Sequence, residues 1–268
     1  MQPTIQLDAA AVSDRGLKRS SNEDSVLCDP PRGLFAVADG MGGHASGEVA
    51  SRLAIETVQR EWRRAARGRS AQGSPDREQH DHDSLLRDVV AAANHAVMER
   101  SRSCDLFAGM GTTLLVAVLH NMTLHYAHVG DSRLYRLRNQ RLSLLTRDHT
   151  VAQWRLELGL CTAAEARVSA GAHRLTRAIG MDPDCGVEVA ACACEPGDGF
   201  LLCSDGLNHE LEDDAIEREW RNALRRDESA DTLCRVLIDQ ANQTGGRDNI
   251  SVLALHLRAQ GQSTTQST

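Results

Sequence analysis

The segment Phe35 to Glu48 reads FAVADGMGGHASGE, and the rest of the sequence can be interpreted from it. An apolar run that is typical of a buried strand ends at Asp39, and glycines occupy much of the turn that follows. A carboxylate at a strand end, next to so much bare backbone, is typical of a site that holds phosphate or a metal ion. These two alternatives predict different residues elsewhere in the chain.

The phosphate alternative fails on the spacing of the glycines. A P-loop requires GxxxxGK[ST], and a dinucleotide site requires GxGxxG. The turn here reads GMGGHASG and has no lysine after it. The sequence therefore favours a metal site at Asp39.

Composition restricts the class of protein. The chain has 268 residues, 41% of them hydrophobic and only 3% aromatic, so aliphatic side chains must fill the core. Its formal charge of −7 argues against a nucleic-acid partner. The longest apolar run, 114–119, is too short to cross a bilayer, and the N-terminus has no signal-like segment. Eight cysteines without CxxC pairs indicate reduced thiols. We expect a cytoplasmic protein without a membrane or nucleic-acid partner.

Strands and helices are expected in clusters, which predicts an α+β fold with mostly antiparallel sheets. Apolar runs predict strands near 34–38, 112–119, 123–129, 132–136, 187–193, 200–203 and 250–257. Helical patterns cover 46–66, 84–103, 213–225 and 228–242. We predict one domain over residues 1–258, a mobile loop at about 67–83 and a disordered tail at 259–268.

Carboxylates also stand at the ends of other predicted strands. FLLCSDG ends at Asp205, LHYAHVGDS carries Asp131, GGRDNIS carries Asp248, and NED supplies Glu23 and Asp24. A single aspartate at such a position is commonplace, because aspartate favours turns. Several that converge need a cation between them, and oxygen ligands favour Mg²⁺ or Mn²⁺ over Zn²⁺.

Eight motifs in order resemble the protein phosphatase 2C family, the metal-dependent Ser/Thr phosphatases. They are SDRGLKRSSNEDS, FAVADGMGGHASGEVAS, GMGTTL, HVGDSRLY, LTRDHT, HRLTRAIG, LLCSDGL and GGRDNIS. The form DGMGGH is similar to that of the bacterial subclass. The resemblance implies a four-layer αββα sandwich, in which helix pairs flank two central antiparallel sheets. It also implies a flap subdomain at about 146–180.

The resemblance implies a core site for two ions of Mn²⁺ or Mg²⁺. Its ligands would be Asp39, which bridges the ions, and Gly40 (through its carbonyl), Glu23, Asp24, Asp205 and Asp248. Asp205 and Asp248 would serve one ion, and Glu23 or Asp24 the other, directly or through water. Asp131 matches a residue that helps to hold a third, weaker ion. Phosphoserine and phosphothreonine would be hydrolysed by in-line attack of a hydroxide that the two core ions share.

Three other residues have expected roles near these ions. Arg19 stands where the family binds substrate phosphate and is also a candidate catalytic residue, because a guanidinium fork suits phosphate oxygens. His44 either acts as a catalytic acid toward the leaving alkoxide or hydrogen-bonds the glycine turn. His209 stands where family members often carry an aspartate of the third ion site, and imidazole suits Mg²⁺ less well.

The resemblance predicts a monomeric signalling enzyme that acts on phosphoproteins, in particular the substrates of a partner Ser/Thr kinase. A catalytically weak relative that binds phosphoproteins as a regulatory module is the alternative. The presence of Arg19 and of the core aspartates favours the enzyme. The variant SDGLN resembles phosphatases that regulate type VI secretion through a threonine kinase. The flap, with His173, Arg174 and Arg177, is either a solvated surface subdomain or a selector of substrates.

Overall fold

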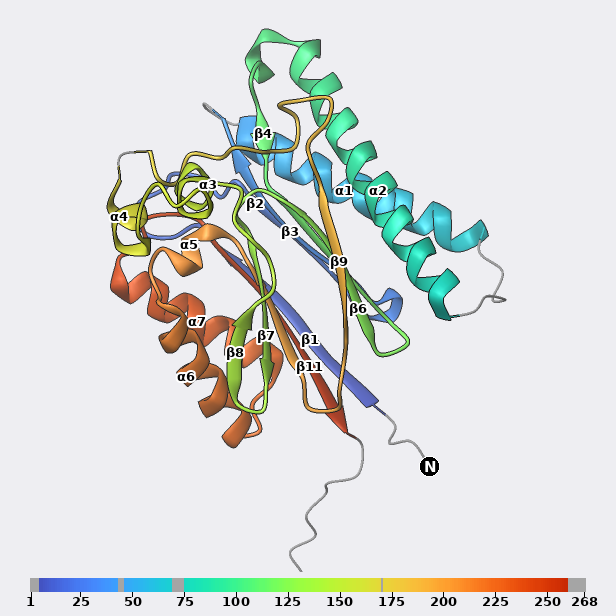
Figure 1. Ribbon diagram of the computed structural model, residues 1–268, viewed down its shortest axis with the longest axis vertical. Helices are drawn as coiled ribbons and strands as arrows, with labels where there is room; N and C mark the ends of the chain where they lie inside the picture. The colour runs from blue at the N-terminus through green and yellow to red at the C-terminus, as the bar shows by residue number, and fades with distance from the viewer. Residues whose placement is uncertain (1–4, 43–45, 69–74, 170, 260–268) are drawn as a thin grey trace, which may run out of the picture.

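The computed structural model describes residues 5–42, 46–68, 75–169 and 171–259. Two antiparallel sheets pack face to face, and a pair of long helices covers the outer side of each sheet (Figure 1). This is the four-layer αββα sandwich that the motifs predicted, and its two sheets bring the strand ends with the carboxylates together.

The first sheet has the strand order β2-β3-β5-β6-β9, and a short strand β4 pairs with β3. Its strands are β2 (Asp24–Asp29), β3 (Leu34–Met41), β4 (Gly111–Thr112), β5 (Leu114–His120), β6 (Thr123–Val129) and β9 (Glu188–Ala193). Helices α1 (Ser46–Gly68) and α2 (Pro75–Ser103) pack on its outer face. Short 3-10 turns lie at Pro30–Arg32 and Asp105–Phe107.

The second sheet has the strand order β1-β11-β10-β7-β8. Its strands are β1 (Ile5–Asp14), β7 (Arg133–Arg138), β8 (Arg141–Leu144), β10 (Gly199–Cys203) and β11 (Ile250–Ala259). Helices α6 (Asp213–Arg225) and α7 (Ala230–Thr244) cover it. The short helices α3 (Val151–Glu157), α4 (Ala163–Val168) and α5 (Asp205–Asn208) lie together at one end of the sandwich (Figure 1).

The strand β3 is apolar without a break over residues 34–38 because both of its faces are buried. Leu34, Ala36 and Ala38 face the core under α1 and α2, whereas Phe35 and Val37 face the core between the sheets. A strand that is buried on both faces reads as a continuous apolar run.

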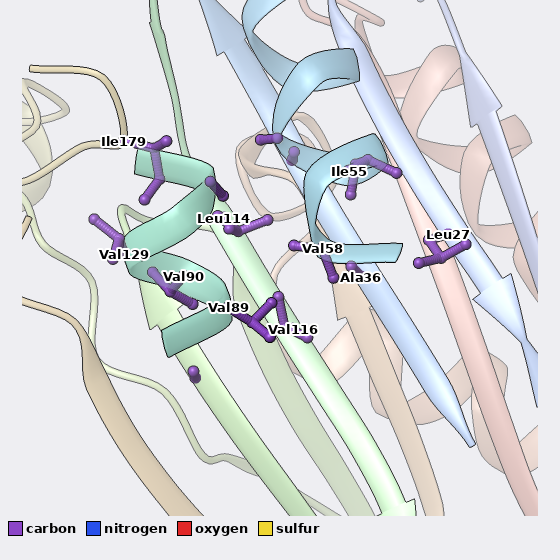
Figure 2. Packing of buried hydrophobic residues seen from close by; sticks show 14 of the residues in the cluster. Leu27, Ala36, Ile55, Val58, Val89, Val90, Leu114, Val116, Val129 and Ile179 are labelled. Carbon is purple, nitrogen blue, oxygen red and sulfur yellow. The ribbon is translucent and has the colours of Figure 1, made fainter. Parts of the chain in front are cut away.

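The core under α1 and α2 consists of interdigitating aliphatic side chains (Figure 2). Val58 of α1 and Val89 of α2 both pack toward the sheet, where Ala36 and Val116 present small and branched surfaces. Burial of each Val or Leu contributes roughly 1.5–3 kcal/mol. This core fixes β3, and therefore fixes where the strand ends at Asp39.

Several boundaries differ from the sequence prediction. The loop expected at 67–83 is wrong over most of its length, because α1 extends to Gly68 and α2 already begins at Pro75. The first turns of α2 (PDREQHDHD) are polar throughout and show no apolar period, which hid the helix. The strands β1, β2 and β8 were not predicted. Residues 69–74 of the loop and 260–268 of the expected tail lie outside the described residues.

Candidate metal centre

Asp24 and Asp39 lie directly opposite each other in the antiparallel pair of β2 and β3. Side chains at directly opposed positions point to the same face, and like charges there destabilise the sheet. Asp24 is buried, and Asp39 lies near the end of β3, one residue before Gly40. The pairing register therefore places two carboxylates side by side where an isolated ionised pair would be costly.

Further carboxylates converge on this pair. Burial raises the pKa of Asp24 to about 7, and the charges of Asp205 and Asp248 add to the effect. Burial also raises the pKa of Asp39 well above its ordinary value, with contributions from Asp24, Asp205 and Asp131. The pKa of Asp131 is raised by burial and then by Asp205. A cation bound among these carboxylates would relieve their mutual repulsion.

The donor atoms fit a hard divalent cation. Oδ1 of Asp24 and Oδ1 of Asp205 are both buried without a hydrogen-bond partner. A buried polar atom without a partner is costly, and coordination to an ion would satisfy it. All of the converging side chains offer oxygen, as Mg²⁺ and Mn²⁺ prefer. These residues therefore fit the ions that the sequence predicted.

Two threonines hold the backbone of Asp39. Its N–H donates to Oγ1 of Thr113 at 2.9 Å, and its carbonyl accepts from Thr113 N at 2.8 Å and from Thr112 Oγ1 at 2.8 Å. Oγ of Ser132 lies 2.8 Å from Oγ1 of Thr113, next to Asp131 in the chain. The motif GMGTTL thus fixes the strand end. The sequence analysis predicted no role for these threonines. The two adjacent hydroxyl residues in GMGTTL were the feature that could have indicated one.

The glycines after Asp39 make room for backbone. A Cβ on Gly40 would lie 2.1 Å from the carbonyl oxygen of Gly47 and 2.6 Å from that of Glu23. A Cβ on Gly47 would lie 2.1 Å from Oε2 of Glu23. The start of α1 therefore packs directly on the strand end and on the Glu23 carboxylate. His44 lies outside the described residues, so both interpretations of it stay predictions.

Asp205 and Asp248 come from the second sheet. Asp205 begins α5 directly after β10, and Asp248 lies two residues before β11. Ser204 joins the two sheets, because its Oγ donates to Oδ2 of Asp24 at 2.7 Å and accepts from Ser251 N at 2.9 Å. Ser204 and Ser251 were not predicted as parts of the site.

Arg19 enters the same group of side chains from the segment between β1 and β2. Its Nη2 donates to Oδ2 of Asp248 at 2.6 Å, and half of its side chain is exposed. Burial raises the pKa of Glu23, and the charge of Arg19 opposes this effect. The guanidinium therefore lies beside the carboxylates, with part of its surface open to solvent.

Asn249 fastens the segment that carries Arg19 and Glu23. It is buried, and its Oδ1 accepts from Glu23 N at 2.8 Å. Its Nδ2 donates to the carbonyls of Arg15 at 2.9 Å and Ser21 at 2.8 Å. The sequence prediction missed this residue, although an amide between Asp248 and an apolar strand in GGRDNIS was a signal for it.

His209 lies at the C-terminal end of α5, with its Nδ1 3.4 Å from Oδ2 of Asp205. The ring of His173, in the segment at about 146–180 that was predicted to form a flap, meets it edge-on at a centroid distance of 4.3 Å. Burial and the neighbouring His209 lower the pKa of His173. The structure thus places His209 beside Asp205, a predicted ligand of a core ion, and in contact with His173.

A cavity of 720 Å³ opens over the carboxylates. The predicted site residues among its lining are Arg19, Glu23, Asp39, Gly40, Asp131, Asp205 and Asp248. The flap contributes His173, Arg174 and Arg177 to the same cavity. Asp24 lies behind this surface, where it bonds Ser204. The structure therefore brings every described residue of the predicted site to this cavity except Asp24, which does not line it.

A second group, of two histidines and a glutamate, lies at the base of the flap. Ligand atoms of His128, His149 and Glu188 all lie within 4.8 Å of one another. Gly130 N donates to Nδ1 of His149 at 3.1 Å, so the neutral ring carries its hydrogen on Nε2, 3.2 Å from Oε1 of Glu188. Arg177 donates to the same oxygen at 3.0 Å. These contacts join His149 and Arg177, which lie near opposite ends of the predicted flap segment, through Glu188.

The comparisons with known proteins agree with this geometry. The family model "Protein phosphatase 2C" matches residues 18–250. The serine/threonine protein phosphatase PstP of Mycobacterium tuberculosis is 36% identical over 253 residues, which cover 93% of this chain and 45% of PstP. The chain thus spans about half the length of that relative. The serine/threonine phosphatase stp of Listeria monocytogenes is 32% identical over 244 residues, 90% of this chain and 92% of stp.

Solved structures show the same fold. The catalytic domain of PstP in complex with two manganese ions superposes with a TM-score of 0.79 at 33% identity, over 95% of this chain and all of that chain. PppA, a key regulatory component of T6SS in Pseudomonas aeruginosa, superposes with a TM-score of 0.75 at 31% identity, over 94% of this chain and 97% of that one. In the part of the chain that the structure describes, no helix is long and apolar enough to span a membrane.

Proposed function

Because the chain belongs to the protein phosphatase 2C family, we propose that it is a metal-dependent protein phosphatase that acts on phosphoserine and phosphothreonine. The observation that carries this proposal is the convergence of Asp39, Asp131, Asp205 and Asp248 on one cavity, with buried carboxylate oxygens that have no partner. A regulatory module that only binds phosphoproteins would not need this cluster, whose assembly opposes folding in the absence of a cation.

The ligands divide between the two sheets. Asp39 would serve both of two ions, Mn²⁺ or Mg²⁺, and its interactions with Asp24, Asp205 and Asp131 support this role. Asp205 and Asp248 would hold one ion, while Glu23 and Asp24 serve the other. Gly40 lies at the cavity surface, which supports the role proposed for its carbonyl. When bound, two divalent ions supply a water of lowered pKa and neutralise charge on the attacking and leaving oxygens.

The protein's own residues provide position and charge. Arg19 reaches the cavity through its exposed half, where its fork can receive two phosphate oxygens. Thr113 and Thr112 hold the Asp39 backbone and so fix the position from which its carboxylate enters the site. Such preorganised groups act without reorganisation cost in a cavity from which water is partly excluded.

The substrates would be phosphoproteins, and the enzyme would oppose a Ser/Thr kinase. The likeness to PppA supports a role in the regulation of type VI secretion. The absence of a spanning helix among the described residues accords with the proposed location in the cytoplasm. We further propose that the enzyme acts as a monomer.

Manganese-dependent hydrolysis of p-nitrophenyl phosphate tests the proposal. Turnover should require Mn²⁺, disappear with EDTA and return when Mn²⁺ is restored. Isothermal titration with Mn²⁺ provides a second measurement on the same sample. A folded protein that binds Mn²⁺ and phosphothreonine peptides without hydrolysing them would contradict the enzyme and support the regulatory module.

A further inference from the structure

A second cavity opens beside the metal centre. It has a volume of 840 Å³ and lies between flap residues, including Ala152, Gln153 and Leu156, and the segment Gly206 to Asp214. We call this cavity the flap groove. Asp131, His173 and Asp248 line both the flap groove and the cavity over the carboxylates. A chain whose phosphate lies at the metal centre can therefore continue into the flap groove.

The flap groove carries a negative charge. Apart from the residues of the metal centre, five carboxylates and two guanidinium groups line it: Asp148, Glu210, Glu212, Asp213 and Asp214 against Arg133 and Arg247. Asp148 is paired with Arg133, and Glu210 with Arg247. Glu212, Asp213 and Asp214 are exposed at the start of α6, where acidic residues also stabilise the helix dipole. Asp213 also accepts from the Tyr135 hydroxyl at 2.9 Å and lies 4.0 Å from Arg133. The lining of the flap groove therefore holds more carboxylates than guanidinium groups, and Asp214 among them is exposed.

The flap side of the groove includes apolar residues. Leu156 lines the groove and is 37% exposed. Trp154, Leu158 and Leu160 in the same segment lie outside the lining of the groove and are between 53% and 62% exposed. Single exposed apolar residues are common, but several large ones in one short segment mark a surface that contacts another molecule.

The negative charge of the flap groove indicates that it binds a part of the substrate other than the phosphate. The metal centre with Arg19 attracts an anion, whereas the flap groove repels one and attracts a cation. An occupant that satisfies both surfaces carries a phosphate and, a few residues away, a positive side chain next to an apolar one. A polypeptide has this chemistry, and its length lets it pass from one cavity to the other.

We propose that the flap groove binds the substrate's own polypeptide beside the phosphorylated residue and selects arginine or lysine there. This inference rests on the proposed phosphatase function, because the phosphate must be held at the metal centre. The exposed carboxylates at the start of α6 attract the basic side chain, and Leu156 contacts an apolar neighbour. The flap would thus choose among phosphoproteins by the sequence that surrounds the phosphate.

Two phosphothreonine peptides that differ only in flanking charge test the proposal. One carries arginine and the other glutamate at the positions around the phosphothreonine, and kcat/KM is measured for both with Mn²⁺. The ratio of the two values within one variant cancels any general loss of activity. The wild-type ratio should favour the arginine peptide by about two- to fivefold for each charge pair. Added salt should reduce the ratio, because exposed charges are screened.

The variant Asp214→Lys should reduce or invert this ratio. Asp231→Lys is the matched control, because Asp231 also lies in the first turn of a helix, α7, and its side chain is half exposed. Leu156→Ala should lower kcat/KM for both peptides alike. The equally exposed Leu224 gives the control Leu224→Ala, which should change neither value.

A wild-type ratio near one would overturn the proposal. So would a ratio that Asp231→Lys changes as much as Asp214→Lys does. Fluorescence anisotropy with the same two peptides gives the ratio of their Kd values without turnover. Missing hydrolysis would then contradict the proposed enzyme, while the Kd ratio still decides whether the groove selects a basic flank.

Discussion

Nη2 of Arg19 lies 2.6 Å from Oδ2 of Asp248, although the two residues are 229 positions apart in the chain. Arg19 comes from the segment before β2, and Asp248 from the segment before β11. The proposed phosphate-binding group and a proposed metal ligand are thus in direct contact. A substitution at either residue can affect both substrate and metal, and the following prediction separates the two effects.

Arg19→Ala should raise KM for a phosphopeptide by about ten- to a hundredfold, because a charge-assisted hydrogen bond to phosphate is lost. The Mn²⁺ concentration that gives half-maximal activity should stay the same or fall, because the variant removes a cation that competes for Asp248. Arg19→Lys keeps the positive charge but not the forked guanidinium, so its KM should lie between the KM of the wild type and that of Arg19→Ala. If the Mn²⁺ requirement rose in proportion to KM, Arg19 would act by orienting Asp248.

Asp39→Asn should reduce kcat by about a hundredfold or more, comparable to the loss of one preorganised electrostatic group. The fold should survive, because Thr113 and Thr112 bond the backbone of Asp39 and not its carboxylate. Circular dichroism should match the wild type, and Asp231→Asn, in an exposed carboxylate of α7, should leave kcat unchanged. Wild-type turnover of Asp39→Asn at saturating Mn²⁺ would contradict the bridging role.

Without bound metal, the protein should become less stable as pH increases. The pKa of Asp24 rises from 3.8 to about 7 on folding, so the folded chain binds more protons than the unfolded chain between these values. The free energy of unfolding then falls as pH increases. In EDTA, Tm should decrease from about pH 4 to pH 7, and Mn²⁺ should abolish most of this slope. Asp24→Asn should reduce the slope of the metal-free curve, while the raised pKa values of Asp39 and Asp131 keep part of it. A metal-free Tm that increases over this range would contradict the prediction.

Asn249→Ala should lower both stability and metal affinity. It leaves Glu23 N and the carbonyls of Arg15 and Ser21 without their buried partner, at a cost of about 3 kcal/mol. Glu23 would then lose its fixed position, so the Mn²⁺ requirement should rise. Chemical denaturation and a Mn²⁺ titration measure the two effects.

Asn94→Ala is the matched control for that variant. Asn94 is also buried and also bonds backbone, at Gly180 and Asp182, but it does not contact the metal centre. It should lose comparable stability without a change in the Mn²⁺ requirement. A rise in that requirement equal to the rise in Asn249→Ala would show that general destabilisation explains both variants.

The convergence of Asp39, Asp131, Asp205 and Asp248 could be predicted from the sequence, because each follows or precedes a predicted apolar strand, and strand ends meet at the edge of a sheet. Glu23 precedes and Asp24 begins β2, a strand that was not predicted. The supports of these carboxylates could not be predicted in the same way. Thr113 and Asn249 act through hydrogen bonds to backbone more than 70 positions away, and no local period or spacing encodes such partners. The strand β1 escaped prediction for a related reason: IQLDAAAVSD has small residues and only a weak alternation, and its place is set by pairing with β11.

His209→Asp should tighten a third ion. Nδ1 of His209 lies 3.4 Å from Oδ2 of Asp205, so a carboxylate at this position would extend the oxygen cluster of Asp205 and Asp131. Imidazole suits Mg²⁺ and Mn²⁺ less well than carboxylate does, so the unmodified chain should hold such an ion weakly. The variant should therefore reach full activation at lower metal concentrations in the millimolar range, above the range that fills the core site.

The double variant His209→Asp with Asp131→Asn should lose this gain, because Asp131 is the other carboxylate of the proposed third site. Mn²⁺ titrations of activity, and of Tm in the same samples, report the third ion separately from turnover. A metal-activation curve that His209→Asp leaves unchanged would show that position 209 takes no part in the site. A structure of the unmodified protein in which His209 coordinates a well-occupied ion would show instead that imidazole serves there as well as a carboxylate.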